Sequence, residues 1–432
     1  MGIEAIVAPP PTHLRVYRRG ERFIAYNPTA PTWVHTNATG AVALKLMDGV
    51  RSFGEIAQLC GENGVPPDSV MDFFDQSSTA GLFMQHPPSR RWERIEWQSR
   101  RIGAVYLHMT NKCNLECSYC YRGSSPRIAI KHGGQDFIDF FERAAPILSA
   151  RPTITFSGGE PMIHPDFFEV ARYCHRAGMR CELLTNGLFV DADNAAEIGR
   201  LFSYVKISLD GASEESHART RGEGHYQQVL DAIGLLAGQP DLAVNVQMTL
   251  HRDNMAESGR LREKLPETVR LKFTPAMPMG RARQDKEDRI SNDEFIAVDE
   301  SVVDPTEGRG ARHLSRNIRS FGCHAGISNI SISDRGDVYP CHLFHKNEFK
   351  LGNIFTDDID TIFFSDTNRT FSQAMDVEEN NERCGSCDFR YLCGGGCKAN
   401  PLHAHGDFRR SDTYCSFIRN NLLDGMFAEV GA

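Results

Sequence analysis

The sequence lacks long hydrophobic runs: no stretch of 18 apolar residues occurs in its 432 positions, so no membrane-spanning helix is expected. The first residues, Met1 to Pro11, have neither the basic start nor the apolar core of a secretory signal peptide. An excess of positive charge is also missing, because 56 Asp and Glu outnumber 48 Lys and Arg and the net charge is -8. These absences argue against a membrane protein and a general nucleic-acid binder, and favour a cytoplasmic protein.

Signs of disorder are missing too, since no low-complexity tract or fixed repeat interrupts a chain that is 41% hydrophobic and 24% charged. A chain of this length can bury more than one core. Cysteine, in contrast, is plentiful, with 13 residues gathered into groups. Clustered thiols in a cytosolic chain indicate metal ligands rather than disulfides.

The first group, Cys113, Cys117 and Cys120, has the spacing CxxxCxxC and directly follows the apolar run Val105 to Met109. Three thiolates can hold three irons of a cubane cluster and leave the fourth iron open to a small-molecule ligand. The alternatives are a structural zinc site or inert thiols. Zinc sites usually close with four Cys or His ligands, and no fourth such ligand stands close to this loop.

Three further motifs each follow a short apolar or β-branched run, at the point where a strand should end. They are Ser157-Gly158-Gly159-Glu160-Pro161, Thr185-Asn186-Gly187 and Ser208-Leu209-Asp210-Gly211. Helical stretches separate them, which predicts the β/α alternation of a parallel barrel. Ligands of such folds bind at the carboxyl ends of the strands.

The cysteine loop, with Tyr119 before its last cysteine, and the GGE run resemble the radical S-adenosylmethionine (SAM) enzymes. The resemblance implies a 4Fe-4S cluster on Cys113, Cys117 and Cys120, whose open iron chelates SAM and whose electron cleaves it to a 5'-deoxyadenosyl radical. It implies further SAM-binding residues, namely Tyr119, Gly158, Gly159, Glu160, Asn186, Ser208 and Arg221. Among these, Asn186 and Ser208 would contact SAM, and Arg221 would pair with its carboxylate.

The second cysteine group fills the C-terminal quarter and resembles the seven-cysteine SPASM domain. Its members are Cys323, Cys341, Cys384, Cys387, Cys393, Cys397 and Cys415. The resemblance implies two auxiliary 4Fe-4S clusters, three clusters in all: Cys384, Cys387, Cys393 and Cys415 would hold one, and Cys323, Cys341 and Cys397 the other. The fourth iron of the latter is left open, or takes a nearby His or Asp, or a substrate thiolate. His324 and His342 are adjacent candidates.

The N-terminal region predicts three strands, Leu14 to Tyr17, Arg22 to Tyr26 and Thr32 to His35, followed by three helices. The helices are expected at Thr39 to Met47, Ser52 to Cys60 and Pro67 to Thr79. This order is typical of a winged helix-turn-helix and resembles the PqqD-like recognition element that binds the leader of a ribosomally made peptide. Winged folds also bind DNA, but six Lys and Arg face seven Asp and Glu between His13 and Phe83, so peptide capture is favoured.

The sequence therefore predicts an α/β protein with a partial (β/α)6 TIM-like radical SAM barrel between an N-terminal PqqD-like winged helix-turn-helix domain and a C-terminal SPASM domain. The expected divisions are a leader-recognition domain at 12–84, a linker at 85–101, the barrel at 102–280, a connection at 281–320, the SPASM domain at 321–420 and a tail at 421–432. A helix is expected within the connection, from Asp293 to Val303.

The predicted function is that of a radical SAM/SPASM oxidoreductase that captures a precursor peptide by its leader and forms a C–C, C–O or thioether cross-link in the core. Flavodoxin or ferredoxin would supply electrons, and neither nucleic acid nor membrane is an expected partner. Alternatives within enzymes are a peptide epimerase, a formylglycine-forming sulfatase-maturase-like protein and a heme-pathway or other small-molecule enzyme. An iron-sulfur redox sensor that binds DNA, or an adaptor with structural clusters, is the alternative of another class.

Overall fold

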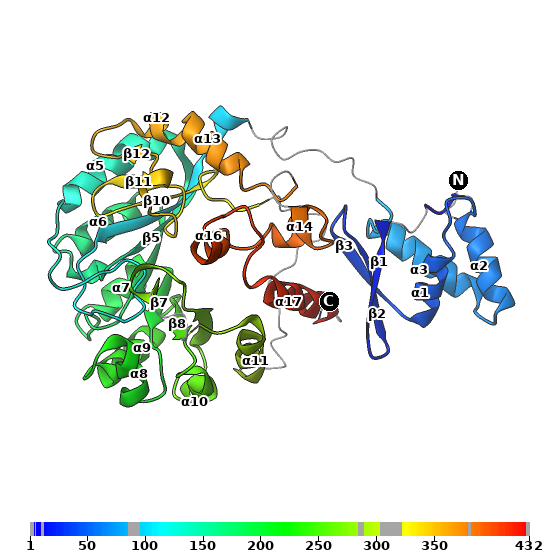
Figure 1. The fold of residues 1–432 in the computed structure, drawn as a ribbon, viewed down its shortest axis with the longest axis horizontal. Helices are drawn as coiled ribbons and strands as arrows, with labels where there is room; N and C mark the ends of the chain where they lie inside the picture. The colour runs from blue at the N-terminus through cyan, green and yellow to red at the C-terminus, as the bar shows by residue number, and fades with distance from the viewer. Residues whose placement is uncertain are drawn as a thin grey trace.

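The computed structural model describes residues 4, 6–9, 13–84, 96–283, 289–302, 322–378 and 382–428. A small N-terminal domain lies at one end of an elongated molecule, and a larger α/β body with the C-terminal helices forms the rest (Figure 1). Within the described residues, no helix has both the length and the apolar character needed to cross a membrane.

The N-terminal domain consists of a three-stranded antiparallel sheet followed by three helices. The strands pair in the order β1 (Arg15–Arg19), β2 (Arg22–Asn27) and β3 (Thr32–Thr36). The helices are α1 (Ala38–Lys45), α2 (Phe53–Glu62) and α3 (Pro67–Thr79). Ser52 and Glu55 form a capping box at the start of α2. The number and order of these elements match the sequence prediction, with ends that differ by at most two residues.

The central sheet confirms the predicted alternation of parallel strands and helices. Six strands lie parallel in chain order: β4 (Ile102–Thr110), β5 (Leu148–Gly158), β6 (Arg180–Thr185), β7 (Tyr204–Ser208), β8 (Ala243–Leu250) and β9 (Arg270–Pro275). The intervening helices are α5 (Gly134–Ala144), α6 (Phe167–Arg176), α7 (Ala195–Leu201), α8 (Glu214–Arg221), α9 (Tyr226–Ala237) and α10 (Ser258–Glu263). All six carboxyl ends therefore meet at one edge, as a parallel order requires.

The two faces of this sheet differ in chemistry, because side chains alternate along each strand. Val105 and Leu107 belong to the fully buried core beneath the helices. Their neighbour Tyr106 points to the other face, where the strand register aligns it with Thr155 of β5 and Glu182 of β6. Lys206 of β7 lies farther along the same face. This second face of the sheet thus carries polar side chains, which suits a face that meets a ligand rather than a packing helix.

The C-terminal segment adds three short strands to the same sheet, which the sequence did not predict. They are β10 (Asn329–Ile332), which runs parallel to β4, β11 (Asp337–Tyr339) and β12 (Gly352–Asn353). Strands of two to four residues leave little hydrophobic pattern to read. The C-terminal segment and the barrel therefore share one sheet and one core.

Helices make up most of the remaining C-terminal structure. Helix α11 (Asn292–Val302) lies where a helix was expected in the connection. It is followed by α12 (Ile359–Phe363), α13 (Asp366–Gln373), α14 (Glu382–Gly385), α15 (Arg390–Cys393), α16 (Ala399–His405) and α17 (Cys415–Ala428). Helix α17 runs without a break across the division expected at 420/421. The predicted connection from 303 to 320 and the linker from 85 to 95 lie outside the described residues.

The N-terminal sheet packs directly on the C-terminal domain. Tyr17 and Tyr26 stack on Phe389, with ring centroids 5.5 Å and 5.6 Å apart. The Tyr26 hydroxyl donates to the carbonyl of Asp388 at 3.0 Å, and the Arg15 guanidinium pairs with the Asp388 carboxylate at 2.8 Å. Trp33 is fully buried in the same contact. One face of the sheet therefore covers its own helices, while the other covers the segment that follows Cys387.

Candidate functional site

The CxxxCxxC loop leaves the carboxyl end of β4 and is held in place by backbone hydrogen bonds. The Cys113 N–H donates to the carbonyl of Ser125 at 3.2 Å, and the Cys120 N–H to the carbonyl of Cys117 at 3.2 Å. Cys113 is buried, which raises the pKa of its thiol to about 12, and nearby Cys117 and Cys120 add to the rise. The structure thus brings the three predicted thiols together at the predicted edge of the sheet.

The Gly158-Gly159 pair lies against this loop so closely that no side chain fits. The Gly159 N–H donates to the carbonyl of Thr110 at 2.8 Å, and the Glu160 N–H to that of Lys112 at 2.9 Å. A Cβ on Gly158 would overlap the Thr110 oxygen, and one on Gly159 would overlap the Lys112 oxygen. Gly158 also has φ +126°, a conformation that favours glycine. The two glycines therefore dock the β5 turn onto the cysteine loop.

Glu160 connects the carboxyl end of β5 to the carboxyl end of β6. It is fully buried, and its carboxylate accepts from the Thr185 hydroxyl at 2.9 Å and from the Asn186 N–H at 2.8 Å. Burial raises the pKa of this carboxyl to about 7, although the hydrogen bonds oppose the shift. The Asn186 amide in turn donates to Asn114 at 2.8 Å and lies 3.9 Å from the Cys113 sulfur. The GGE and TNG motifs are thereby connected to the cysteine loop.

Arg221 lies beside the loop, where its guanidinium is 4.0 Å from the Cys117 sulfur. It pairs with Asp210 at 2.6 Å and donates to the Tyr119 hydroxyl, which itself donates to Asp210. Asp210 is fully buried and also accepts from the Thr249 N–H at 2.8 Å. Burial alone would raise the pKa of Asp210, but the charge of Arg221 and the hydrogen bonds outweigh it, so the pKa is lowered. Arg221 is thus ion-paired inside the protein, at a place from which it can also reach a ligand.

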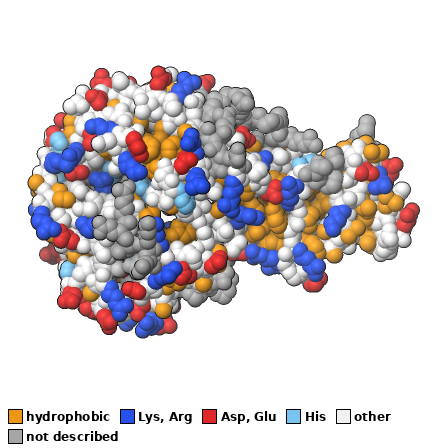
Figure 2. Space-filling view, viewed as in Figure 1, with side chains coloured by type: hydrophobic (Ala, Val, Ile, Leu, Met, Phe, Trp, Pro, Cys, Tyr) orange, Lys and Arg blue, Asp and Glu red, His pale blue; other side chains and the backbone are white. Residues whose placement is uncertain are grey.

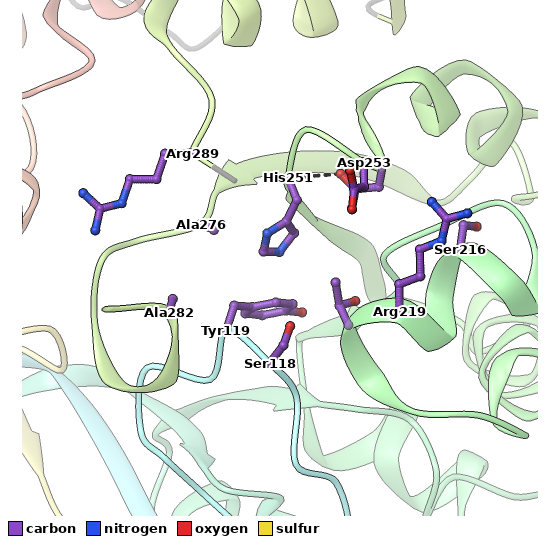
Figure 3. Close-up of a pocket in the computed structure, with 11 residues that line it drawn as sticks. Ser118, Tyr119, Ser216, Arg219, His251, Asp253, Ala276, Ala282 and Arg289 are labelled. Atoms are coloured by element: carbon purple, nitrogen blue, oxygen red, sulfur yellow. Dashed lines mark hydrogen bonds between the residues drawn. The ribbon is translucent and has the colours of Figure 1, made fainter. Parts of the chain in front are cut away.

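A cavity of roughly 160 Å³ opens on the outer side of Tyr119. Figure 3 shows Tyr119 and Ser118 from the cysteine loop below His251, with Arg219 and Asp253 to the right of these residues. The rings of Tyr119 and His251 are 4.9 Å apart. Predicted Ser208 ends β7, partly buried, in register with Gln247. Sequence reasoning missed His251, because a single histidine after a strand carries no distinctive signal.

A clamp on the cysteine loop comes from the segment after β9, which sequence reasoning also missed. The Arg281 side chain donates to the carbonyls of Cys117 at 2.7 Å and Ser124 at 2.9 Å, and its N–H donates to that of Cys120 at 3.1 Å. Gly280, with φ +54°, approaches Cys120 so closely that a Cβ would overlap the Cys120 oxygen. The segment after β9 therefore covers the cysteine loop, which follows β4.

Four C-terminal cysteines surround a single cavity of about 260 Å³. They are the predicted set Cys384, Cys387, Cys393 and Cys415, contributed by α14, α15, the start of α17 and the turn between α14 and α15. Burial raises the pKa of the Cys393 thiol to about 11, and Cys384 and Cys415 raise it further. Gly394, Gly395 and Gly396 have φ values of 63°, 84° and 70°, so the chain turns tightly around this cavity.

The other three cysteines, Cys323, Cys341 and Cys397, form a separate group. Burial raises the pKa of the Cys341 thiol to about 12, and neighbouring Cys323 and Cys397 contribute to the rise. His342 lies next to Cys341, with its Nδ1 3.6 Å from that sulfur, and its ring stacks on Tyr106 at 4.1 Å. His324 is exposed. Of the two predicted candidates, His342 faces the polar side of the sheet.

The residues fit iron-sulfur clusters on chemical grounds. Burial raises the pKa of seven of these thiols, which therefore hold protons that a metal displaces when it binds. They are Cys113, Cys117, Cys341, Cys384, Cys393, Cys397 and Cys415. Among the described residues, no three His, Cys, Asp or Glu groups converge as ligands of one ion would. In a cubane each thiolate bonds a different iron, so wider spacing is needed. Cys60, Cys174 and Cys181 are buried outside all three groups.

Two protein-family models match this chain, one over the parallel sheet and one over the C-terminal segment. Residues 107–263 match the radical SAM superfamily, and residues 323–388 match the SPASM iron-sulfur cluster-binding domain. The chain is 30% identical over 331 residues to the antilisterial bacteriocin subtilosin biosynthesis protein AlbA of Bacillus subtilis, covering 74% of this chain and 71% of AlbA. It is 26% identical over 348 residues to an AdoMet-dependent heme synthase of Methanosarcina barkeri, and the match covers 72% of this chain and 96% of the synthase.

A solved structure with a similar fold is that of Streptococcus suis SuiB bound to the precursor peptide SuiA. The TM-score is 0.59 at 14% identity, and the match covers 93% of this chain and 98% of SuiB. At this identity the likeness concerns the fold alone. It extends over the N-terminal region as well as over the barrel and the C-terminal domain.

Proposed function

Because this chain belongs to the radical SAM superfamily, as an enzyme of the SPASM subfamily that uses SAM and iron-sulfur clusters, we propose that it modifies a ribosomally made precursor peptide. The observation that carries the proposal is the hydrogen-bonded connection of the three-cysteine loop, through Asn186 and Glu160, to neighbouring strand ends. The relation to AlbA, a bacteriocin biosynthesis protein, favours a peptide substrate. The product would be a C–C, C–O or thioether cross-link.

In this proposal Cys113, Cys117 and Cys120 hold one cluster, and bound SAM supplies a 5'-deoxyadenosyl radical for hydrogen abstraction from carbon. Asn186, Ser208, Arg221, Tyr119 and the Gly158-Gly159-Glu160 turn bind and orient SAM. Asp210 holds the Arg221 guanidinium at one angle through a buried ion pair, so little reorientation is needed when a carboxylate arrives. Glu160 keeps the β5 and β6 turns together.

The core peptide would lie over the polar face of the sheet. Lys206 is on this face, and burial lowers its pKa, with the charge of Lys272 adding to the decrease. With the Asn245 amide in the orientation that satisfies both its oxygen and its nitrogen, that oxygen accepts from the Lys272 ammonium at 3.0 Å. His342 comes from the C-terminal group to the same region, and burial lowers its pKa to about 3, so it is neutral near pH 7. A neutral imidazole can accept a hydrogen bond from the substrate.

Two auxiliary clusters, one on the four-cysteine cavity and one on Cys323, Cys341 and Cys397, would accept the electron left after an oxidative bond formation. This electron count favours a cross-link over a redox-neutral epimerisation, which needs a hydrogen donor. Reduction before each turnover would come from flavodoxin or ferredoxin. A formylglycine-forming enzyme is ranked lower because His342 stands where those relatives have an Asp, and because of the extra N-terminal domain.

The leader would bind to the N-terminal domain as an added strand beside β3, as in a PqqD-like recognition element with a winged helix-turn-helix arrangement. Among the described strands, β3 pairs with β2 and lies at one end of the three-stranded sheet. Such edges capture extended peptides through main-chain hydrogen bonds. Val42 on α1 is 53% exposed, and Figure 2 shows hydrophobic side chains gathered at the narrow end of the molecule. Apolar leader side chains could bury this surface.

Replacing Val34 with proline in β3 should weaken binding of the leader at least about tenfold, because proline removes a backbone N–H and distorts the edge strand. Cleavage of SAM should be unchanged, since the barrel is not touched. Fluorescence anisotropy with a labelled leader peptide of a candidate precursor measures the affinity. The matched control is Val50→Pro, in a turn of the same domain where the side chain is 77% exposed. Equal affinity in the Val34 and Val50 variants would discredit the capture site.

Anaerobic reconstitution with iron and sulfide tests the function directly. About twelve irons per chain are expected from three 4Fe-4S clusters, with release of 5'-deoxyadenosine when SAM and a strong reductant are added. Stoichiometric zinc, or iron without SAM cleavage, would instead support a sensor or a structural metalloprotein.

Heme synthesis is the second candidate, because the chain is also related to AdoMet-dependent heme synthases. It leaves residues 13–84 without a role. Deoxyadenosine production that depends on a porphyrin rather than on a peptide would decide in its favour.

A further inference from the structure

Lys398 is a buried lysine between the two C-terminal cysteine groups. It directly follows Cys397 and precedes α16, yet only 2% of its surface is exposed. Within the part of the chain that the structure describes, its ammonium makes no ion pair and no side-chain hydrogen bond. Burying an ammonium group without a partner costs several kcal/mol, so such a residue needs a compensating negative charge.

The lysine side chain runs back beneath the glycine turn to the four-cysteine cavity. A Cβ built on Gly395 would lie 2.6 Å from the Lys398 Nζ and 3.1 Å from its Cε. Gly395 itself lines the cavity, together with Cys384 and Cys393. Burial raises the pKa of the Cys384 thiol, and the charge of Lys398 is the first influence that opposes this rise. The ammonium therefore approaches the cavity wall from inside the protein.

Other charged groups nearby already have different partners. The Asp412 carboxylate accepts from the Cys397 N–H at 2.6 Å, from Asn400 at 2.9 Å and from the Tyr414 N–H at 2.8 Å. The arginines at the cavity are less buried than Lys398: Arg383 and Arg419 are exposed, and Arg390 is half-buried and donates to the Cys387 carbonyl at 3.0 Å. Within the described residues, Lys398 is thus a buried cation that forms no ion pair with a carboxylate.

We propose that Lys398 is a positioning residue whose ammonium is the buried countercharge of the auxiliary iron-sulfur cluster held by Cys384, Cys387, Cys393 and Cys415. The proposal rests on the cluster assignment under the proposed function. Four thiolates give such a cluster a net negative charge, and reduction adds one more. A fixed positive charge nearby favours the reduced state, so Lys398 raises the reduction potential of this cluster.

The first test measures potential rather than activity. EPR-monitored redox titration is done on the reconstituted full chain in a background with Cys113, Cys117 and Cys120 changed to alanine, which leaves only the auxiliary clusters. Lys398→Met should lower the potential of one of the two clusters, whereas Lys398→Arg should keep it near the original value. Lys264→Met, an exposed lysine at the end of α10, is the control and should change neither potential. Equal potentials in the Lys398→Met and control proteins would overturn the proposal.

The second test uses the metal-free protein, where the countercharge is missing. Lys398→Met should raise the thermal unfolding midpoint of the apoprotein, because methionine is buried without the cost of an unpaired charge. A lowered midpoint would contradict the inference, since it would mean that the ammonium already has a protein partner. Iron counting accompanies both tests. Absence of iron from the parent chain would refute the cluster assignment itself, whereas normal iron with unchanged potentials would refute only the role of Lys398.

Discussion

Replacing Cys113 with alanine should abolish SAM cleavage, with a loss of at least about 1,000-fold in the rate of 5'-deoxyadenosine release. Cys113 is the most buried thiol of its group and the one next to the Asn186 amide, at 3.9 Å. Two remaining thiolates cannot fix three irons, so the open iron loses its geometry. The auxiliary cysteines are distant from the change, and about eight irons should therefore remain after reconstitution.

The matched control is Cys174→Ala, which removes a thiol buried in the barrel core outside all three groups. This variant should keep its full iron content and its SAM cleavage, with a modest decrease in stability. Leader affinity should be equal in both proteins because the N-terminal domain is unaltered. Full SAM cleavage by Cys113→Ala would show that the loop does not hold the catalytic cluster.

Replacing Cys387 with alanine should have the opposite profile: SAM is still cleaved, but the modified peptide is lost. Cys387 lines the four-cysteine cavity, which is formed by the C-terminal helices and not by the loop after β4. If the auxiliary cluster removes an electron from the substrate after hydrogen abstraction, loss of this cluster uncouples SAM cleavage from formation of the modified peptide. Mass spectrometry of the precursor, alongside deoxyadenosine quantification, separates the two readouts.

Cys60→Ala serves as the control for this experiment, since Cys60 is a buried thiol of the N-terminal core. It should give product at the normal ratio to deoxyadenosine. The same ratio in Cys387→Ala would refute the role of this cluster as an electron acceptor.

The sequence was most informative where chemistry demands a fixed residue. Cysteine spacing predicted three groups, and the structure brings Cys384, Cys387, Cys393 and Cys415 around one cavity as expected. The β/α alternation was also predictable, because apolar runs ended repeatedly at Gly- or Asn-containing turns. Gly159 was predicted for its place beside SAM, and the structure adds a second reason, which is that a Cβ at this position would overlap the Lys112 carbonyl oxygen.

Contacts between distant segments could not be predicted from local patterns. Nothing around Arg281 indicates that it binds the carbonyls of Cys117 and Ser124, more than 150 positions earlier. The partners of Arg221 were likewise hidden, since an arginine pairs with Asp210 only when the fold brings the end of α8 back to β7. Such polar contacts form only when the folded chain brings separate segments together, and the hydrophobic periodicity of the sequence does not indicate them.

The packing of the N-terminal sheet on Phe389 has a consequence for protein engineering. A domain that is attached by a linker alone can be exchanged for another. Here Tyr17, Tyr26 and Trp33 are one half of a hydrophobic contact, and Phe389 and Phe427 are the other half. Deleting residues 13–84 would leave that second half bare and prone to self-association. A chimaera must therefore carry a donor domain whose outer sheet face is complementary to Phe389 and α17, or must transplant α17 with it.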